Sequence, residues 1–186
     1  ASIFSKQIEN GIALGKVSVI TSIDAGYKSN FRKIHSADMF DKVWANLSKY
    51  AAAKKACRDN VVQAKYIVIP TVNDSKEEIK RFILKAYKSG IKHLIFSVDF
   101  CWILENPDDA KTMKKIIELM HYFIKTCVIL DLEWHIWAFA EDIIKRYNKI
   151  SVEDKADYAC IFDKNLYKNE KNQFLNFLLK MESLFS

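Results

Sequence analysis

The fold is decided by residues 61–78, which read VVQAKYIVIPTVNDSKEE. The segment 61–72 is nearly continuously apolar toward its end, as expected of a strand that is covered on both faces. Asn73 and Asp74 end this predicted strand. The next four residues, 75–78, form a capping box, in which the Ser hydroxyl accepts a free backbone N–H and the Glu reaches back. The stretch therefore predicts a strand followed directly by a helix, which we expect to end near Gly90.

The same alternation of strand and helix extends to both sides of this stretch. On the N-terminal side, the pattern predicts a helix over 3–14, a strand over 17–23, a loop over 27–35 and a helix over 36–54. On the C-terminal side, it predicts a strand over 93–100 and a helix that begins at 107–109 and runs to Thr126. Such alternation implies parallel strands joined by right-handed crossover helices, so the predicted fold class is α/β.

The pattern is weaker after Thr126. A helix over 133–147 suits the aromatic and branched residues there, while 128–132 is compatible with a short fourth strand. This region carries an aromatic stripe that consists of Trp134, Trp137, Phe139 and Tyr147. We interpret these side chains as packing residues of a helix rather than as a platform for base stacking. Residues 152–162 stay ambiguous, and 171–185 predict a closing helix with one apolar stripe.

Composition narrows the class of protein. Half of the 186 residues are hydrophobic and only four are Gly and two Pro, which excludes a disordered chain and disfavours an all-β fold. The length suggests one domain. The net charge of +6 (29 Lys+Arg minus 23 Asp+Glu) lies mostly on lysines spread along helices, so we expect solvated helix faces and no nucleic-acid partner. Because no long apolar run occurs, we expect a cytoplasmic protein without a membrane partner.

The four cysteines, Cys57, Cys101, Cys127 and Cys160, are too far apart in sequence to form a local metal-binding motif. We interpret them as reduced, mostly buried thiols rather than as a disulfide scaffold. Residues 131, 133 and 135 are Asp, Glu and His, but alternate residues share a face only on a strand. Since a helix is predicted there, we expect no metal site in this chain.

Polar residues follow each of the three predicted strands. They lie in 22–26 (SIDAG), 70–74 (PTVND) and 97–101 (SVDFC). Ligands of parallel α/β folds bind at the carboxyl ends of the strands, so these segments are the candidate site. The alternative is that each polar side chain only satisfies the backbone of its own turn.

Taken in order, these motifs resemble a known family. The stretches VSVITSIDAG (17–26), FRKI (31–34), FDKVWANL (40–47) and KYIVIPTVND (65–74), then SKEEI and FSVD, resemble the second half of the radical S-adenosylmethionine superfamily core. The resemblance covers about residues 3 to 100. It implies a partial (β/α) barrel, the C-terminal half of a (β/α)6 TIM-like barrel. Within it, we assign 1–107 to barrel units and 108–186 to a mostly helical extension of one single domain.

The resemblance also implies a set of cofactor-binding residues. In the family, the Ser of the S-x-D strand contacts the ribose of S-adenosylmethionine, which here is Ser22. The polar residue of the next strand contacts the methionyl or adenosyl part and falls on Lys65, while 67–71 would pass along the adenine. Arg32 would lie near cofactor or substrate. The remaining residues are Asp24 and Asn73 at the rim, where they would orient loops, and Asp99, which would face the substrate.

The chain departs from the family in one respect, since it has no CxxxCxxC motif. In the family, those three thiolates hold a [4Fe–4S] cluster that binds the methionine part and supplies an electron. The resemblance therefore implies that this chain is the C-terminal part of an enzyme whose cluster segment precedes Ala1. The full-length protein would cleave S-adenosylmethionine reductively to a 5′-deoxyadenosyl radical, acting on an unknown small-molecule or peptide substrate. This chain alone would be inactive and bind neither cofactor.

Two further expectations concern partners. A strand at 17–23 without its preceding neighbour would expose an unpaired edge, so we expect the missing part of the barrel, another copy of the chain or its terminal segments to cover it. The competing hypothesis is a non-catalytic, basic α/β binding module for RNA or a protein partner, and a flat salt response would exclude the RNA partner.

Overall fold

A computed structural model describes residues 2–53, 62–137 and 140–151 of the chain. In chain order, the elements are α1 (Lys6–Ala13), β1 (Val19–Ser22), α2 (Lys28–His35), α3 (Phe40–Ala52), β2 (Val62–Val68), α4 (Lys76–Lys88), β3 (His93–Val98), α5 (Phe100–Glu105), α6 (Ala110–Ile129), β4 (Glu133–Ile136) and α7 (Ala140–Ile150). The predicted α/β class is confirmed.

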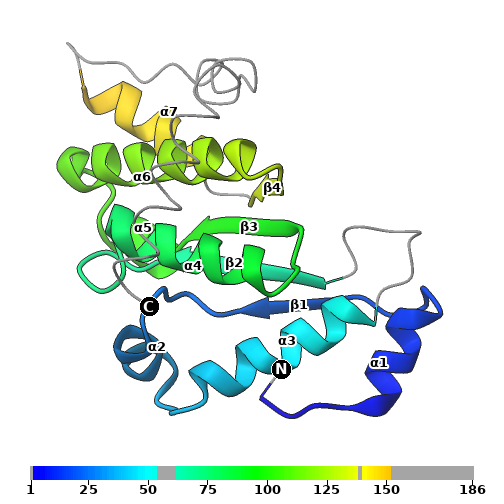
Figure 1. Cartoon of the computed structure of the whole chain (residues 1–186). Coiled ribbons are helices and arrows are strands. Elements are labelled where there is room, and N and C mark those ends of the chain that lie inside the picture. Colours follow the sequence, from blue (N-terminus) through cyan, green and yellow to red (C-terminus); the bar gives the residue numbers. More distant parts are fainter. Residues whose placement is uncertain (1, 54–61, 138–139, 152–186) are drawn as a thin grey trace.

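The four strands form one parallel sheet with the order β1-β2-β3-β4. Each strand from β2 to β4 therefore pairs with the strand that precedes it in the chain. Since right-handed crossovers made in the same direction place their helices on the same face, one side of the sheet carries α3, α4 and α6 (Figure 1). Contacts of α3 and α4 with β2, and of α6 with β3 and β4, agree with this arrangement.

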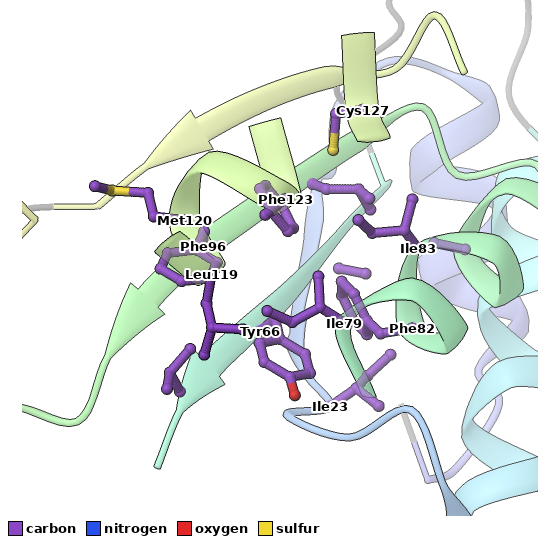
Figure 2. Close-up of a cluster of buried hydrophobic side chains, with 14 of the residues drawn as sticks. Ile23, Tyr66, Ile79, Phe82, Ile83, Phe96, Leu119, Met120, Phe123 and Cys127 are labelled. Carbon is purple, nitrogen blue, oxygen red and sulfur yellow. The ribbon is translucent and has the colours of Figure 1, made fainter. Parts of the chain in front are cut away.

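The core lies between this face of the sheet and the helices. On β2, Tyr66 packs against Phe82 of α4 with ring centroids 5.0 Å apart, and on β3, Phe96 packs against Phe123 of α6 at 5.2 Å. Figure 2 shows these four rings within one cluster of buried side chains. Burial of each such side chain contributes about 1.5–3 kcal/mol, so this cluster fixes which face of each strand turns away from the helices.

We call that opposite side of the sheet the distal face. Along β2, every second residue from Val62 to Val68 is buried toward the helices, which leaves Gln63, Lys65 and Ile67 on the distal face. Parallel register extends this assignment to the neighbouring strands, because paired residues of a sheet point to the same side. The distal face therefore also carries Ile20 and Ser22 of β1, Ile95 and Ser97 of β3, and Glu133 and His135 of β4.

The segment 27–35 is a helix, α2, and the predicted loop is wrong. The only buried residue of α2 is Phe31, whose ring lies 5.4 Å from that of Phe40. The helix ends at His35 and is capped by Ser36, which adopts a left-handed conformation with φ 51°. Because Ser36 closes α2, the following helix begins at Phe40 rather than at the predicted residue 36.

The region after Thr126 also differs from the prediction. Helix α6 continues to Ile129, and the left-handed Asp131 then turns the chain into β4. The alternative of a strand over 128–132 is therefore wrong. The expected helix over 133–147 is wrong in its first part, since the helix in this region, α7, begins at Ala140. The strand β4 extends the sheet beyond residue 107, where we expected a mostly helical extension. Trp134 thus lies on a strand, whereas Tyr147 is buried on α7.

A short helix, α5, follows β3 where we expected the strand to continue to Phe100. Asp99 begins it, because the Asp99 carboxylate accepts a hydrogen bond from the backbone N–H of Cys101 at 3.0 Å. Cys101 is exposed and Cys127 is buried, so the expectation of mostly buried thiols holds for one of these two.

Several predictions concern residues that lie outside the described part of the chain. They are the helix over 171–185, the ambiguous segment 152–162, Phe139, Cys57 and Cys160. Within the described part, no helix combines the length and the apolar character needed to cross a lipid bilayer.

Candidate functional site at the carboxyl edge of the sheet

The loops that follow β1 and β2 are joined by the side chain of Asn73, which is 1 % exposed. Its amide Nδ2 donates hydrogen bonds to the carbonyl oxygens of Asp24 and Ile67, each at 2.7 Å. Its Oδ1 accepts a hydrogen bond from the N–H of Ile69 at 2.6 Å. The buried hydroxyl of Tyr66 donates to the carbonyl of Asn73 at 2.6 Å. Asn73 therefore fixes both strand ends at the same edge of the sheet.

Asp24 adopts a left-handed backbone conformation with φ 59°, which is uncommon outside glycine but is tolerated best by Asn and Asp. This turn brings its carboxylate back to β2, where Oδ1 accepts a hydrogen bond from the N–H of Ile67 at 2.8 Å. The side chain is almost fully buried. Burial raises the pKa of Asp24 to about 6, and the Ile67 hydrogen bond and the nearby His35 and Lys65 oppose this rise. Asp24 is thus a buried carboxyl group whose pKa lies well above the ordinary value of a carboxyl group.

His35 closes the same corner from the end of α2. Its Nε2 lies 3.0 Å from the carbonyl oxygen of Ile23 and 3.5 Å from Oδ2 of Asp24. The imidazole also packs against the ring of Phe31 in a tilted arrangement, with ring centroids 4.5 Å apart. With its proton on Nε2, His35 donates to the Ile23 carbonyl and places its partial positive charge beside the carboxylate.

Gly26 allows the loop after Asp24 to touch the start of α4. Its N–H donates a hydrogen bond to the carboxylate of Glu78 at 2.6 Å, and the N–H of Tyr27 donates to the same oxygen at 3.3 Å. A Cβ atom on Gly26 would lie only 2.1 Å from the carbonyl oxygen of Glu78. Burial raises the pKa of Glu78, and its hydrogen bonds from Gly26, Tyr27 and Asn30 counteract this effect.

The predicted capping box is therefore only half formed. The Ser75 hydroxyl accepts a hydrogen bond from the N–H of Glu78 at 3.2 Å, as predicted. The Glu78 carboxylate does not return to Ser75, because it binds the loop after β1 and the side-chain amide of Asn30 at 2.6 Å. Glu78 thus connects three segments of the chain instead of closing one helix end.

Ser22 and Lys65 are direct partners in the parallel register of β1 and β2. Both side chains therefore point to the distal face, where Ser22 is exposed and Lys65 is half-buried. The ammonium Nζ of Lys65 lies 3.7 Å from the ring centroid of Trp137. Burial lowers the pKa of Lys65, while the charge of Asp24 raises it. The structure thus brings two predicted cofactor residues together and adds Trp137 to them.

No protein-family model, no curated protein and no solved structure matches this chain. The chemistry of the site must therefore be argued from its geometry and from the motifs quoted above.

The other predicted site residues lie at or near the same edge in different roles. Arg32 is exposed on α2, the helix whose last residue is His35. Asp99 caps α5, and its N–H donates to the carbonyl of Val68 at 2.9 Å, which connects β3 to β2. Asp74 accepts a hydrogen bond from Nζ of Lys115 at 2.7 Å. Asp74 and Asp99 are thus engaged with the protein itself.

Glu133 and His135 share the distal face because β4 is a strand. We expected no metal site here because we predicted a helix, and that reason is wrong. The Glu133 carboxylate is instead 3.1 Å from Nδ1 of His93. Over residues 2–53, 62–137 and 140–151, no three His, Cys, Asp or Glu side chains come together as metal ligands.

Sequence reasoning missed His35 and Trp137 as members of the site. His35 carried a weak signal, because it follows the FRKI motif, but its contact with Asp24 depends on α2 being helical. Trp137 was interpreted as a helix-packing residue, and only the register of β4 against β3 places it beside the site.

Proposed function

We propose that this chain is the C-terminal part of a radical S-adenosylmethionine enzyme and that its distal face binds the nucleoside-bearing sulfonium. The observation that carries the proposal is the register pair Ser22 and Lys65, which places a hydroxyl group and an ammonium group side by side on one face. Without parallel pairing of β1 with β2, the two motifs that contain these residues would have no common site.

The sheet order supports the proposed partial (β/α)6 barrel. In doubly wound sheets the strand order reverses at a switch point and helices cover both faces, whereas a (β/α) barrel keeps sequential strands adjacent with helices outside. The order β1-β2-β3-β4 with helices on one face follows the second pattern. The distal face would then line the interior of the barrel.

The polar groups of the distal face suit part of the cofactor. The Ser22 hydroxyl can exchange hydrogen bonds with ribose hydroxyls, and the Lys65 ammonium can pair with the carboxylate of the methionyl group. Asp24 and Asn73 hold the two strand ends in place by the hydrogen bonds described above. Arg32 would contact the cofactor or substrate from α2.

The iron–sulfur cluster has no such fit in the described residues. Cys127 is buried in the helix core and Cys101 is exposed at the start of α5, so these two thiols do not form part of one ligand set. The proposal therefore requires a CxxxCxxC segment outside this sequence. When bound there, the cluster would supply the electron that cleaves the sulfonium, and this chain would bind and orient the nucleoside.

The test uses the complete protein that contains this sequence, after anaerobic reconstitution with iron and sulfide. We expect formation of 5′-deoxyadenosine, and we expect Ser22→Ala and Lys65→Ala to raise the KM for S-adenosylmethionine. Lys92→Ala is the control, because Lys92 also lies against an aromatic ring, that of Tyr87, but at the opposite end of β3. Absence of CxxxCxxC from the complete coding sequence, or a loaded cluster without cleavage, would overturn the proposal.

The alternative of a basic binding module gains no support from the lysines of this structure. Lys28 lies 3.0 Å from Asp38, Lys85 lies 3.4 Å from Asp41 and Lys115 lies 2.7 Å from Asp74. Such pairs are typical of a solvated helix surface and lower the local positive potential that would attract RNA.

A further inference from the structure

Trp137 lies immediately after β4 and extends its pairing with β3. Its N–H donates a hydrogen bond to the carbonyl of Phe96 at 2.9 Å. Trp134 and Ile136 pack against the core, so alternation along the strand places Trp137 with Glu133 and His135 on the distal face. Trp137 is 48 % exposed. Its backbone is thus fixed, while the residue remains partly accessible to solvent.

The contact between Trp137 and Lys65 spans the width of β3. Lys65 is in register with Ile95, and Ile95 is in register with His135, two residues before Trp137. The indole therefore reaches back over β3 to meet the ammonium group, with Nζ only 3.7 Å from the ring centroid. This distance is well inside the limit of about 6 Å for an effective cation–π interaction, and Trp is the strongest of the aromatic partners.

An aromatic partner can prepare a lysine for ligand binding by limiting the positions of its ammonium group. Its four-carbon chain samples many rotamers, and fixing it costs conformational entropy. The nearby charge of Asp24 competes for the same ammonium group. A rigid indole with two side-chain torsions can hold the ammonium group over the middle of the sheet.

We propose that Trp137 is a positioning residue that holds the Lys65 ammonium group over β3, in the row that begins with Ser22. The strand β4, which the family resemblance does not reach, then contributes to the binding site. The positioning of Lys65 stands on the contact itself; its consequence for S-adenosylmethionine rests on the proposed function.

The direct test is NMR spectroscopy of this chain with lysine labelled at Cε, with the Lys65 signal assigned by Lys65→Arg. We expect ring-current shielding of the Lys65 methylene protons, loss of that shielding in Trp137→Leu and partial retention in Trp137→Phe. Tyr87→Leu is the matched control: it removes the ring beside Lys92, whose Nζ is 5.5 Å from the centroid, and it should leave Lys65 unchanged. A Lys65 signal that is the same in folded Trp137→Leu and in the unsubstituted chain would overturn the positioning role.

A second measurement separates this inference from the proposed function. In the complete, reconstituted enzyme, Trp137→Leu should raise the KM for S-adenosylmethionine about two- to fivefold with a smaller change in kcat, and Trp137→Phe should recover part of the loss. If Lys65→Ala leaves KM unchanged while the NMR shielding is present, the proposed function fails and the positioning of Lys65 stands. If Lys65→Ala raises KM but Trp137→Leu does not, the positioning role fails and the proposed function stands.

Discussion

The Nδ2 atom of Asn73 donates a hydrogen bond to the backbone carbonyl of Asp24 across 49 positions of sequence, and so connects the ends of β1 and β2. Removal of the amide in Asn73→Ala would leave this carbonyl and the N–H of Ile69 without their partner in a buried corner. We expect a loss of roughly 2–4 kcal/mol in the free energy of unfolding, measured by urea denaturation. Asn10→Ala, on the exposed side of α1, should change it by less than about 0.5 kcal/mol. Equal effects of both substitutions would contradict this role for Asn73.

Asp24 should make stability depend on pH in an unusual direction for a carboxyl group. Because burial raises its pKa from 3.8 to about 6, the folded state binds the proton more tightly than the unfolded state. This contribution to stability is present below the unfolded pKa of 3.8 and is lost as the pH rises through about 6. Asp24→Asn removes the titration and keeps a side chain that tolerates a left-handed backbone.

We therefore compare the free energy of unfolding of Asp24→Asn with that of the unsubstituted protein. The difference should shift in favour of Asp24→Asn by roughly 1–3 kcal/mol between pH 4 and pH 8. Denaturation curves at both pH values would measure it. The control is Asp41→Asn, since Asp41 is exposed on α3. An advantage that is independent of pH would show that Asp24 does not titrate in this range.

Gly26 should tolerate no side chain, for a steric reason alone. Its Cβ would lie 2.1 Å from the carbonyl oxygen of Glu78, so Gly26→Ala must displace the loop from α4 at a cost of roughly 1–3 kcal/mol or more. Gly15→Ala is the matched control, because Gly15 has φ +68° but no heavy atom within 4 Å of the place that its Cβ would take. That substitution should cost only about 1–2 kcal/mol of backbone strain. Thermal denaturation compares the two, and a smaller loss for Gly26→Ala would contradict the packing argument.

Glu78 should couple energetically to the loop after β1 more strongly than to the cap of its own helix. Its carboxylate binds Asn30 and Gly26, whereas Ser75 interacts only with its backbone N–H. A double-mutant cycle of Glu78→Ala with Asn30→Ala should give a coupling energy of about 0.5–3 kcal/mol. The cycle of Glu78→Ala with Ser75→Ala should give a value near zero. A larger coupling energy of Glu78 with Ser75 than with Asn30 would contradict this prediction and indicate a complete capping box.

Self-association remains a prediction of the exposed sheet edge. Within the described strands, β1 has a neighbour only on the β2 side, and Ile20 on its distal face is 57 % exposed. We expect this chain, without further segments, to associate with rising concentration, and Ile20→Lys to weaken that association. Ile3→Lys is the control, since Ile3 is 78 % exposed but precedes α1. Analytical ultracentrifugation would measure it. A strictly monomeric chain would contradict self-association and leave the alternative that the terminal segments of the chain cover β1.

The central strands and helices were predictable because their signals are local. The apolar runs of β2 and β3 and the amphipathic pattern of α4 each lie within one element, and Gly90, with φ +74°, marks the end of α4. The helix α2 was missed because it buries only Phe31. It is held largely by Asn30, whose partner Glu78 is 48 positions away. No local pattern contains such a contact.

The candidate site was predictable only in part for the same reason. The positions of Ser22 and Lys65 follow from two strand motifs, and their pairing follows from parallel register. Trp137 could not be placed, since β4 has only four residues and its exposed positions resemble a helix surface until the strand pairs with β3. The left-handed conformation of Asp24, which brings its carboxylate to Ile67, likewise depends on β2.

The order of the strands has a consequence for synthesis on the ribosome. Each new strand pairs with the one made just before it, so every partner is already available when a strand emerges from the exit tunnel. The nascent chain can therefore add one strand and its helix at a time to the sheet, from the N-terminal side, before distant segments are translated.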